Sequence, residues 1–350
     1  MKKILFTGGG SAGHVIPNLA LIEELLAQGK VDVCYMGSDG IEKKLLVGKN
    51  IPYFTLSCPK LVRDKNFTAL KNNLAIPCAF QRAVKEAERG LKLFQPDLVF
   101  SKGGYVALPV VFAAKRLGIP CLAHESDFSP GLANRLSAKK CKAVLTAFPE
   151  TANRFRNGKY GGAPIRRSVL TAKRTASRKS LEIPQRANVL LVFGGGSGSK
   201  AVNEALRASL NSLTKKYLIL HVCGRGNVVE SNFKNYRQYE FASDMGVMYA
   251  SADLVVSRAG AGAVFELLAL KKPSILIPLE GATRGDQWEN AEYFQQKGLC
   301  CVLAQKDLHQ LEEEIDAAFV DKALKQRLIE SNYTSGNTRI IKEITSLLYE

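Results

Sequence analysis

The stretch TGGGSAGH, residues 7–14, directly follows the apolar run Lys3–Phe6. Gly8, Gly10 and Gly13 satisfy the spacing GxGxxG. A glycine-rich turn between a strand and a helix places backbone N–H groups at the positive end of the helix, and this geometry favours a phosphate group. The stretch therefore predicts a strand, a phosphate-binding turn and a helix. On its own, it is also compatible with a nicotinamide dinucleotide site.

Outward from this opening, short β-rich runs alternate with stretches whose apolar residues recur every three or four positions. This alternation predicts a parallel sheet with helices on both faces. Helices are expected at Val15–Gln28 and Val106–Leu117. Strands are expected at Lys3–Phe6, Asp32–Met36, Asp97–Phe100, Pro120–Ala123 and Ala143–Thr146.

The same order begins again after residues 172–186, a stretch rich in Lys, Arg and Ser. The apolar strand Asn188–Phe193 leads into GGGSGS, residues 194–199, and a helix is predicted over Lys200–Leu213. Two such openings predict two Rossmann-like domains, with a boundary between residues 160 and 170. Further strands are expected at Tyr217–Val222, Leu254–Ser257, Ser274–Pro278 and Cys300–Leu303.

Composition narrows the class of protein. The chain has 350 residues, 46% of them hydrophobic and 23% charged, which fits a globular protein with room for two domains. No apolar stretch is long enough to span a membrane, and the apolar start ends at Phe6, so no secretory signal is expected. The eight cysteines are scattered without a CxxC pair, which favours a reduced, cytosolic chain without a zinc site.

Positive charge is concentrated in the first half of the chain. Of the formal net charge of +17, residues 1–170 carry +14. This excess indicates an anionic partner, which could be a phosphorylated ligand, an acidic membrane surface or a nucleic acid. A nucleic-acid-binding protein is the least favoured of these, because the basic residues are dispersed and no aromatic-interleaved binding motif accompanies them.

A second constellation lies in SRAGAGAVFELLALKKPSILIPL, residues 257–279. Glu266 follows Gly260 by six residues, so its carboxylate can accept both hydroxyls of a ribose while the amides of the turn meet phosphates. GATRGDQWENA, residues 281–291, adds polar groups suited to a hydroxyl-rich ligand. These features favour a sugar nucleotide over a nicotinamide cofactor, since only the late, glycine-flanked Asp39 could close the second strand of a dinucleotide fold.

Five ordered motifs carry a family resemblance. GGGSAGHVIPNLAL, SKGGYVALPVVFAAKRLGIPCLAHESD, GGAPIR, SRAGAGAVFE and RGDQWENA together resemble the MurG family, the UDP-N-acetylglucosamine:undecaprenyl-pyrophosphoryl-muramoyl-pentapeptide N-acetylglucosaminyltransferases of peptidoglycan synthesis. The resemblance implies an α/β GT-B glycosyltransferase fold, with two Rossmann-like domains and an interdomain cleft. It implies an acceptor-binding and membrane-associating domain at 1–163, completed by a C-terminal helix at 336–350, and a UDP-GlcNAc-binding domain at 164–335.

The resemblance also implies a reaction. GlcNAc would pass from UDP-GlcNAc, with inversion, to the C4 hydroxyl of MurNAc in undecaprenyl-pyrophosphoryl-MurNAc-pentapeptide (lipid I), giving lipid II. Such an enzyme would be peripheral on the cytoplasmic face of the plasma membrane, with roles in cell shape and division. Its partners would be the two substrates, the anionic inner leaflet and possible cell-wall or division proteins, with no nucleic acid.

The family's donor-binding residues fall in the second half of this sequence. Arg258, Gly260, Ala261 and Gly262 would form the nucleotide-binding turn, with Glu266 on the ribose. Gly194, Gly195 and Gly196 would lie near the donor diphosphate, where Arg166 would neutralise charge. Ala242 and Met245 would wall the uracil, and Asp286 and Gln287 would hold the GlcNAc hydroxyls.

The acceptor-binding residues fall in the first half. Ser11, Gly13 and His14 would face the acceptor, and Tyr105, Glu125 and Asp127 would line the cleft. His14 is the preferred general base because a helix N-terminus disfavours imidazolium and leaves the ring able to accept a proton. Asp127 and Glu125 are the reserve candidates. The sequence has no Asp-x-Asp motif, so no obligatory metal is expected.

The sequence departs from the family pattern in three places. The chain has GGGSGS where members commonly read GGSQGA, Asp127 where asparagine is frequent, and Ala263 where threonine is often found. Asp127 places an added negative charge near an anionic acceptor. These departures affect single contacts and leave the framework intact.

Membrane association is predicted for Phe67–Phe80, FTALKNNLAIPCAF, which mixes apolar residues with Lys71 and is followed by Arg82 and Lys85. An ordinary core helix is the alternative, although Pro77 argues against one unbroken helix. Alternative functions are another GT-B enzyme, such as a lipid glycosyltransferase with a different acceptor or a UDP-GlcNAc 2-epimerase, and a basic nucleic-acid-binding protein.

Overall fold

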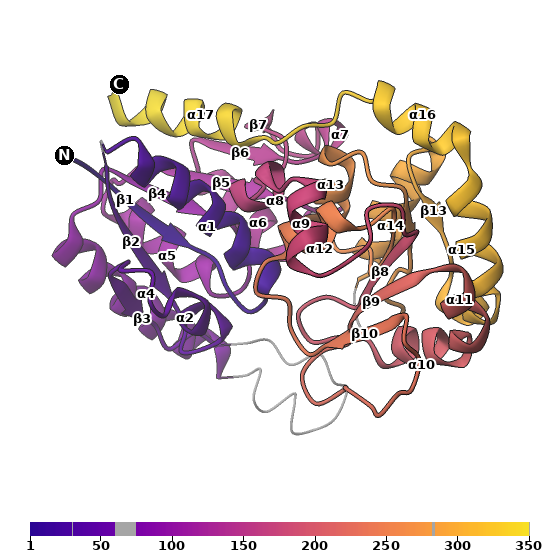
Figure 1. Cartoon of the computed structure of the whole chain (residues 1–350). Helices are drawn as coiled ribbons and strands as arrows, with labels where there is room; N and C mark the ends of the chain where they lie inside the picture. The colour runs from indigo at the N-terminus through magenta and orange to yellow at the C-terminus, as the bar shows by residue number, and fades with distance from the viewer. Residues whose placement is uncertain (30, 60–74, 282–283, 350) are drawn as a thin grey trace. The chain divides into compact units, whose positions relative to one another are not determined.

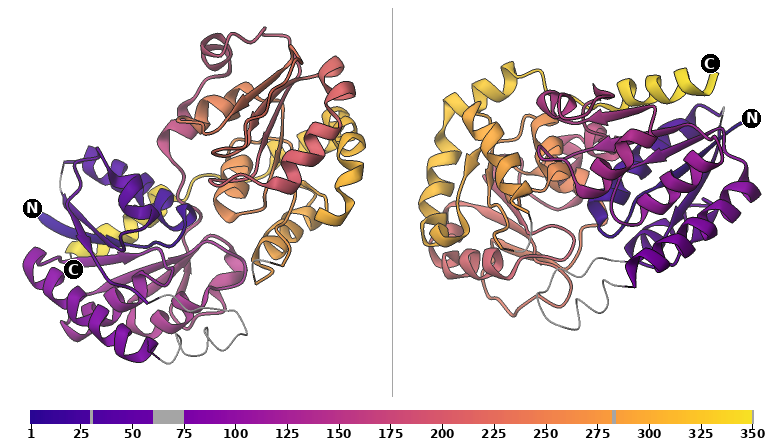
Figure 2. Two further views of the ribbon diagram at one scale, coloured as in Figure 1. Left: turned by 90° about the horizontal axis from the view of Figure 1, so that it is seen from below. Right: turned by 180° about the vertical axis from the view of Figure 1, so that it is seen from behind.

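The computed structural model describes residues 1–29, 31–59, 75–281 and 284–349 (Figure 1). The chain forms two compact units, called here unit 1, Met1–Arg166 with Gly336–Glu350, and unit 2, Arg167–Ser335. Both ends of the chain belong to unit 1 (Figure 2). Within the described ranges, no helix is both long and apolar enough to cross a membrane.

Unit 1 contains a seven-stranded sheet in the order β3-β2-β1-β4-β5-β6-β7. All of its paired strands run parallel. The order reverses between β1 and β4, which is where an open α/β sheet forms a crevice at the carboxyl ends of its strands. The strands are β1 (Lys2–Thr7), β2 (Val31–Gly37), β3 (Tyr53–Thr55), β4 (Leu98–Ser101), β5 (Cys121–Glu125), β6 (Ala143–Thr146) and β7 (Gly158–Tyr160).

Helices cover both faces of this sheet because successive strand residues point to opposite sides. Ile4 and Phe6 of β1 belong to a buried cluster with residues of α1 and α17, whereas Leu5 belongs to a second cluster with residues of α4 and α5. α17 is therefore part of the core of unit 1. The helices are α1 (Ala12–Ala27), α2 (Ile41–Leu46), α4 (Ile76–Phe94), α5 (Ala107–Arg116), α6 (Leu132–Ser137), η1 (Ala138–Lys140), α7 (Pro149–Ala152) and α17 (Asn337–Tyr349).

The predicted membrane element Phe67–Phe80 lies mostly outside the described residues, which resume at Ala75. Pro77 lies in the first turn of α4, where the missing N–H costs nothing, so this proline begins a helix. Phe80 is half-buried and meets Phe112 of α5 edge to face, with ring centroids 5.3 Å apart. This phenylalanine therefore contributes to the packing of α4 on α5.

Unit 2 contains a six-stranded sheet, β10-β9-β8-β11-β12-β13, which is also parallel throughout its described pairs. Its strands are β8 (Val189–Phe193), β9 (Leu218–Val222), β10 (Tyr236–Tyr239), β11 (Leu254–Ser257), β12 (Ser274–Leu276) and β13 (Cys301–Val302). Its helices are α8 (Arg167–Thr171), α9 (Arg174–Ser180), α10 (Lys200–Ala208), α11 (Leu210–Lys216), α12 (Met245–Ser251), α13 (Ala261–Ala269), α14 (Asp286–Gln296), η2 (Gln305–Gln310), α15 (Leu311–Val320) and α16 (Lys322–Glu330).

The prediction of one helix over Lys200–Leu213 is wrong, because α10 and α11 meet at Ser209. The backbone of Ser209 leaves the helical region, with φ −99° and ψ 6°. Its carbonyl accepts a hydrogen bond from the Ser212 hydroxyl at 3.0 Å. The same carbonyl accepts from the Leu213 amide at 3.0 Å, so α11 begins directly after Ser209, and serine is a frequent residue at helix ends.

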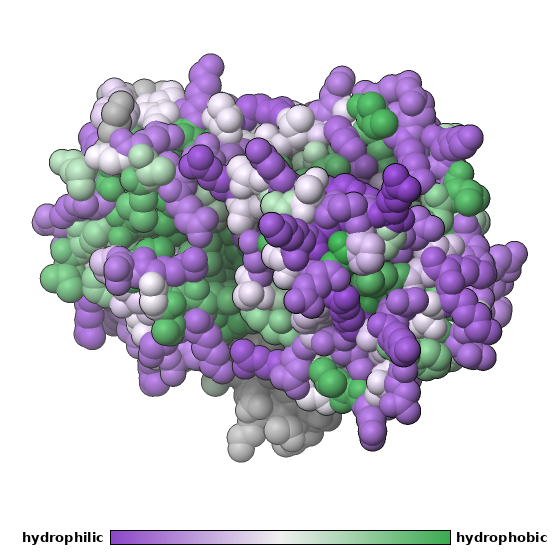
Figure 3. Space-filling model, viewed as in Figure 1, coloured by the Kyte–Doolittle hydropathy of each residue, from purple (hydrophilic) through white to green (hydrophobic). Residues whose placement is uncertain are grey.

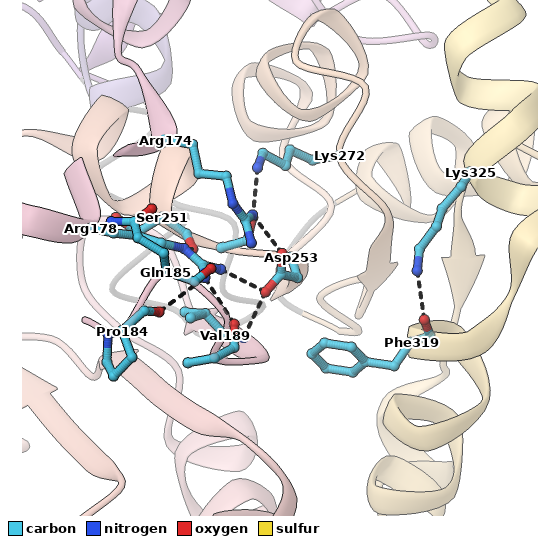
Figure 4. Close-up of polar contacts among 12 residues, drawn as sticks. Arg174, Arg178, Pro184, Gln185, Val189, Ser251, Asp253, Lys272, Phe319 and Lys325 are labelled. Atoms are coloured by element: carbon cyan, nitrogen blue, oxygen red, sulfur yellow. Dashed lines mark hydrogen bonds and ion pairs between the residues drawn. The ribbon is translucent and has the colours of Figure 1, made fainter. Parts of the chain in front are cut away.

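A buried arginine holds together residues 172–186, the stretch that is rich in Lys, Arg and Ser. Arg178 of α9 is fully buried, and its guanidinium bonds the Asp253 carboxylate at 2.8 Å (Figure 4). Asp253 also accepts from the amide of Val189 at 2.8 Å and from Arg174 at 2.6 Å. These donors hold the pKa of Asp253 below its usual value although burial alone would raise it. The guanidinium also donates to the carbonyls of Pro184, Gln185, Ala187 and Ser251.

The substitution Arg178→Met is expected to destabilise unit 2 by about 3–5 kcal/mol, because it leaves a partly buried carboxylate and several buried carbonyls without their donor. Denaturant unfolding measures this loss. The fluorescence of Trp288, the only tryptophan in the sequence, reports selectively on unit 2.

The matched control is Arg174→Met, which removes the other arginine on Asp253. The side chain of Arg174 is 45% exposed, so its ion pair is expected to contribute less than about 1 kcal/mol. Equal losses in the two variants would contradict the central role assigned to Arg178.

Candidate active site

The first glycine loop, residues 8–13, leaves the carboxyl end of β1 and is held by a buried carboxylate. Glu42 accepts hydrogen bonds from the amides of Gly10 at 3.3 Å and Ser38 at 2.8 Å. A Cβ at Gly9 would lie 2.5 Å from a Glu42 oxygen, so any larger residue there would displace this carboxylate. Sequence reasoning missed Glu42, which looks like an ordinary helix glutamate and carries no motif.

The predicted residues His14 and Tyr105 gather around this loop. A Cβ on Gly10 would lie 2.7 Å from the Tyr105 ring, and one on Gly104 would lie 3.1 Å from the His14 ring. His14 is half-buried in the first turn of α1, and its amide donates to the Ser11 carbonyl at 3.1 Å. Ser11 is the N-cap of α1, and Ser11 and Gly13 are both exposed. The structure thus places three of the predicted acceptor residues at the start of α1, and Tyr105 beside the loop that precedes it.

Glu125 ends β5 and organises the segment that follows it. One carboxylate oxygen accepts from the amide of Asp127 at 3.0 Å. The other accepts from the amide of Gly131 at 2.7 Å and from the side chain of Asn134 at 2.9 Å. Glu125 is only 4% exposed, whereas Asp127 is half-buried. These contacts give Glu125 a structural role. Asp127 lies nearer the surface than Glu125.

The second glycine loop, Gly194–Ser199, follows β8 in unit 2. A Cβ at Gly198, where φ is +76°, would lie 2.1 Å from the Cys223 carbonyl, so the turn requires glycine there. Gly195 and Gly196 are exposed, and a Cβ on either would meet open space. Ser199 is the N-cap of α10. GGGSGS therefore keeps the form of a glycine loop before a helix.

The side chain of Arg258 contacts the last residue of this loop. Its guanidinium donates to the Ser199 hydroxyl at 2.8 Å and to the Gln305 side chain at 2.6 Å. It also donates to the carbonyl of Pro278 at 3.1 Å. Burial lowers the pKa of Arg258, and Glu280 opposes that shift. The side chain of Arg258, predicted to belong to the nucleotide-binding turn, thus joins three segments of the protein.

The turn before α13 places the predicted ribose ligand. Gly260 is the N-cap of α13, Ala261 and Gly262 form its first turn, and Glu266 lies further along the same helix. Glu266 is 8% exposed and accepts a hydrogen bond from the Tyr249 hydroxyl at 3.0 Å. Tyr249, from α12, is a second residue that sequence reasoning missed, since its contact depends on how two helices pack.

The remaining predicted donor residues occupy three places. Ala242 is buried ahead of α12, and Met245 is the first residue of that helix. Asp286 begins α14 and accepts from the amide of Arg284 at 3.0 Å, while the Gln287 carbonyl oxygen accepts from the amide of Leu279 at 3.0 Å.

Arg166 is half-buried and is the last residue of the first segment of unit 1. It follows Ile165, whose amide donates to Asn337 at 2.9 Å. In the part of the chain that the structure describes, no cluster of three or more His, Cys, Asp or Glu could hold a metal ion.

The two units match the two halves of one class of enzyme. Residues 4–146 match the glycosyltransferase family 28 N-terminal domain, and residues 189–344 match the corresponding C-terminal domain. Together with the two parallel sheets, these matches define a glycosyltransferase with the GT-B fold.

Relatives identify the family within this class. The chain is 44% identical, over 88% of its length and 87% of the relative's, to the UDP-N-acetylglucosamine--N-acetylmuramyl-(pentapeptide) pyrophosphoryl-undecaprenol N-acetylglucosamine transferase of Clostridium perfringens. It is 40% identical, over 99% and 98%, to the transferase of the same name from Clostridium novyi. The crystal structure of Acinetobacter baumannii MurG has a TM-score of 0.76, with 26% identity over 99% of this chain and 100% of that one. The chain belongs to the MurG family, as its five motifs predicted.

Proposed function

We propose that this enzyme transfers GlcNAc from UDP-GlcNAc to the MurNAc C4 hydroxyl of undecaprenyl-pyrophosphoryl-MurNAc-pentapeptide, with inversion, and thereby forms lipid II for peptidoglycan synthesis. The observation that carries this proposal is the 44% identity, over 88% of the chain, to a transferase named for these substrates. The two glycine loops, each ahead of a helix, support it, because both substrates contain phosphates.

The donor is proposed to bind unit 2. The turn Gly260–Gly262 offers amides at the positive end of α13 to the nucleotide phosphates, and Glu266 accepts the ribose hydroxyls. The hydrogen bond from Tyr249 fixes the orientation of the Glu266 carboxylate. Ala242 and Met245 wall the uracil in this proposal.

Asp286 and Gln287 are assigned to the GlcNAc hydroxyls. The Gln287 carbonyl oxygen is engaged by Leu279, which leaves the amide N–H groups of Gln287 as its contribution to the sugar. Gly194, Gly195 and Gly196 are proposed to approach the diphosphate, where Arg166 and the helix ends supply positive potential as the leaving group departs. The reaction in this form requires no metal.

The acceptor is proposed to bind unit 1. The amides of the first glycine loop lie at the positive end of the sixteen-residue helix α1 and suit the acceptor pyrophosphate. His14, in the first turn of that helix, takes the proton of the attacking hydroxyl, and Asp127 is the second candidate for this task. The three N–H groups that Glu125 accepts favour a scaffolding role for Glu125 over one as the base.

Unit 1 is also proposed to bind the anionic inner leaflet, which would make the enzyme peripheral on the cytoplasmic face of the plasma membrane. Phe80 of α4 contacts Phe112 of α5, and the Lys140 ammonium lies 4.0 Å from the centre of the Phe112 ring. The adjoining helix α6 exposes Leu132 and Leu136, each about half.

The same helices carry exposed cations, among them Arg82 and Lys85 on α4 and Arg135 on α6. Figure 3 shows a different face of unit 1 from the one that α4, α5 and α6 form. On that face, apolar areas lie among hydrophilic surface on the side of α1, α2 and β2 (Figure 1). Apolar residues beside cations suit a surface that binds anionic lipid.

The substitution His14→Ala is expected to lower kcat about a hundred- to ten-thousand-fold, because general-base assistance is lost. UDP release from UDP-GlcNAc, measured with a short-chain lipid I analogue and a chelator, gives the rate. UDP binding should remain unchanged. A kcat close to that of the unsubstituted enzyme would transfer the role of the base to Asp127, which Asp127→Asn then tests.

The substitution Glu266→Ala is expected to weaken UDP binding about tenfold or more, through the loss of charged hydrogen bonds to the ribose. Tyr249→Phe should weaken it less, since the carboxylate remains. Trp288 fluorescence follows both titrations. 2′,3′-Dideoxyuridine diphosphate is the matched ligand, and both substitutions should leave its affinity unchanged. Equal weakening for the two nucleotides would refute a ribose contact.

The double substitution Arg82→Gln/Lys85→Gln is expected to weaken binding to anionic vesicles about thirtyfold, at about 1 kcal/mol for each charge. Vesicle sedimentation measures it. Lys215→Gln/Lys322→Gln removes two exposed charges from unit 2 and serves as the control. Membrane docking through α4 is wrong if the two double variants sediment alike.

A further inference from the structure

Lys102 is a cation buried at the carboxyl edge of the unit 1 sheet. It directly follows β4, in the sequence SKGG, and is only 1% exposed. Its ammonium donates a hydrogen bond to the Ser126 hydroxyl at 2.7 Å. Charged side chains are seldom buried to this degree unless other charges compensate them.

The backbone fixes Lys102 between the first glycine loop and the segment after β5. The amide of Lys102 donates to the Thr7 carbonyl at 2.8 Å. The Cβ of Lys102 lies 3.0 Å from the position that a Cβ on Gly8 would take. Gly103 and Gly104 both have positive φ, at +86° and +81°. A side chain at Gly103 would strike Asn134, and one at Gly104 would strike the Gly9 carbonyl. The two glycines therefore allow the turn that carries Lys102 to pack closely against the first glycine loop.

Two carboxylates flank the residue that the buried ammonium contacts, since Glu125 and Asp127 are the sequence neighbours of Ser126. Burial lowers the pKa of Lys102, while Glu125 and Asp127 act against that shift. Glu125 is already engaged by three N–H donors. Asp127 is half-buried and directly follows Ser126, so its negative charge lies next to the buried cation and close to the loop proposed to bind a pyrophosphate.

We infer that Lys102 is a positioning residue that neutralises Asp127 and so lets an anionic acceptor bind at the first glycine loop. It acts through Asp127 and Ser126, with no contact to the acceptor of its own. The inference rests on the proposed function in one respect, namely that the acceptor carries a pyrophosphate. Without Lys102, the charge of Asp127 opposes acceptor binding and affects KM more than kcat.

The test compares the unsubstituted enzyme with Lys102→Met, Asp127→Asn and the double variant. Methionine retains most of the apolar stem of lysine and removes its charge. Lys102→Met is expected to raise the KM for a short-chain lipid I analogue about tenfold, the scale of one nearby charge in a partly solvated site. In the Asp127→Asn background, the same substitution should change KM by less than about twofold, the usual limit of additivity.

KM and kcat are measured separately, so that an effect on acceptor binding is distinguished from the loss of a general base. If Asp127 also serves as the base, kcat falls in both variants that lack it, and the comparison of KM values is unaffected. A tenfold rise in KM from Lys102→Met in both backgrounds would overturn the inference, and so would no rise in either. Lys142→Met is the matched control, since Lys142 is exposed and immediately precedes β6, at the opposite edge of the sheet.

Two measurements decide the inference without catalysis. If the enzyme uses another acceptor, it releases no UDP with the lipid I analogue, and the proposed function fails. Thermal unfolding of the four proteins then measures the coupling, and Lys102→Met should lower Tm less in the Asp127→Asn background. Calorimetric binding of inorganic pyrophosphate should weaken in Lys102→Met alone. Additive Tm shifts, or pyrophosphate binding that is equal in all four proteins, would refute charge compensation.

Discussion

The parallel direction of the strands is the constraint on which the rest of this structure depends. Every described strand pair in both sheets is parallel, so the carboxyl ends of the strands meet at one edge of each sheet. Three segments of unit 1 thus become neighbours: the glycine loop after β1, the turn after β4 that begins with Lys102, and the segment after β5 that begins with Ser126. More than a hundred positions of sequence separate the first from the last. In unit 2 the second glycine loop and the turn before α13 share an edge for the same reason, because β8 pairs with β11.

Buried charged side chains hold these assembled loops together. Glu42 ties the first glycine loop to the segment after β2, and Arg258 ties the second one to the ends of two other segments. Lys102 ties the turn after β4 to Ser126 after β5, whereas Arg178 joins the segments that lead into β8 and β11 at the opposite edge of the unit 2 sheet. Glu42, Arg258 and Arg178 each satisfy several groups, so the removal of any one of them would leave these groups unpaired at once. A charge in the interior here specifies where a loop lies.

Local patterns were sufficient to predict most of the fold. Apolar runs marked the central strands, and glycine spacing marked both glycine loops, because these signals lie within a few residues of one another. Short, partly exposed edge strands such as β3 and β7 gave no such signal, and the break at Ser209 was missed because the apolar pattern continues across it. The buried charges could not be predicted, since nothing local separates Arg178 from the other 48 Lys and Arg residues. The roles of the site residues stay predictions.

The last helix has a consequence for how this protein is made. α17 supplies Ile340 and Ile344 to the core that also contains Ile4 and Phe6 of β1. α1 covers part of this face of the first sheet, but the rest stays exposed as the chain leaves the ribosome until α17 emerges, and such a nascent apolar surface attracts chaperones or other chains. Unit 2 is continuous in sequence and has all of its residues by Ser335. The domain that is translated first is thus the one that finishes folding last.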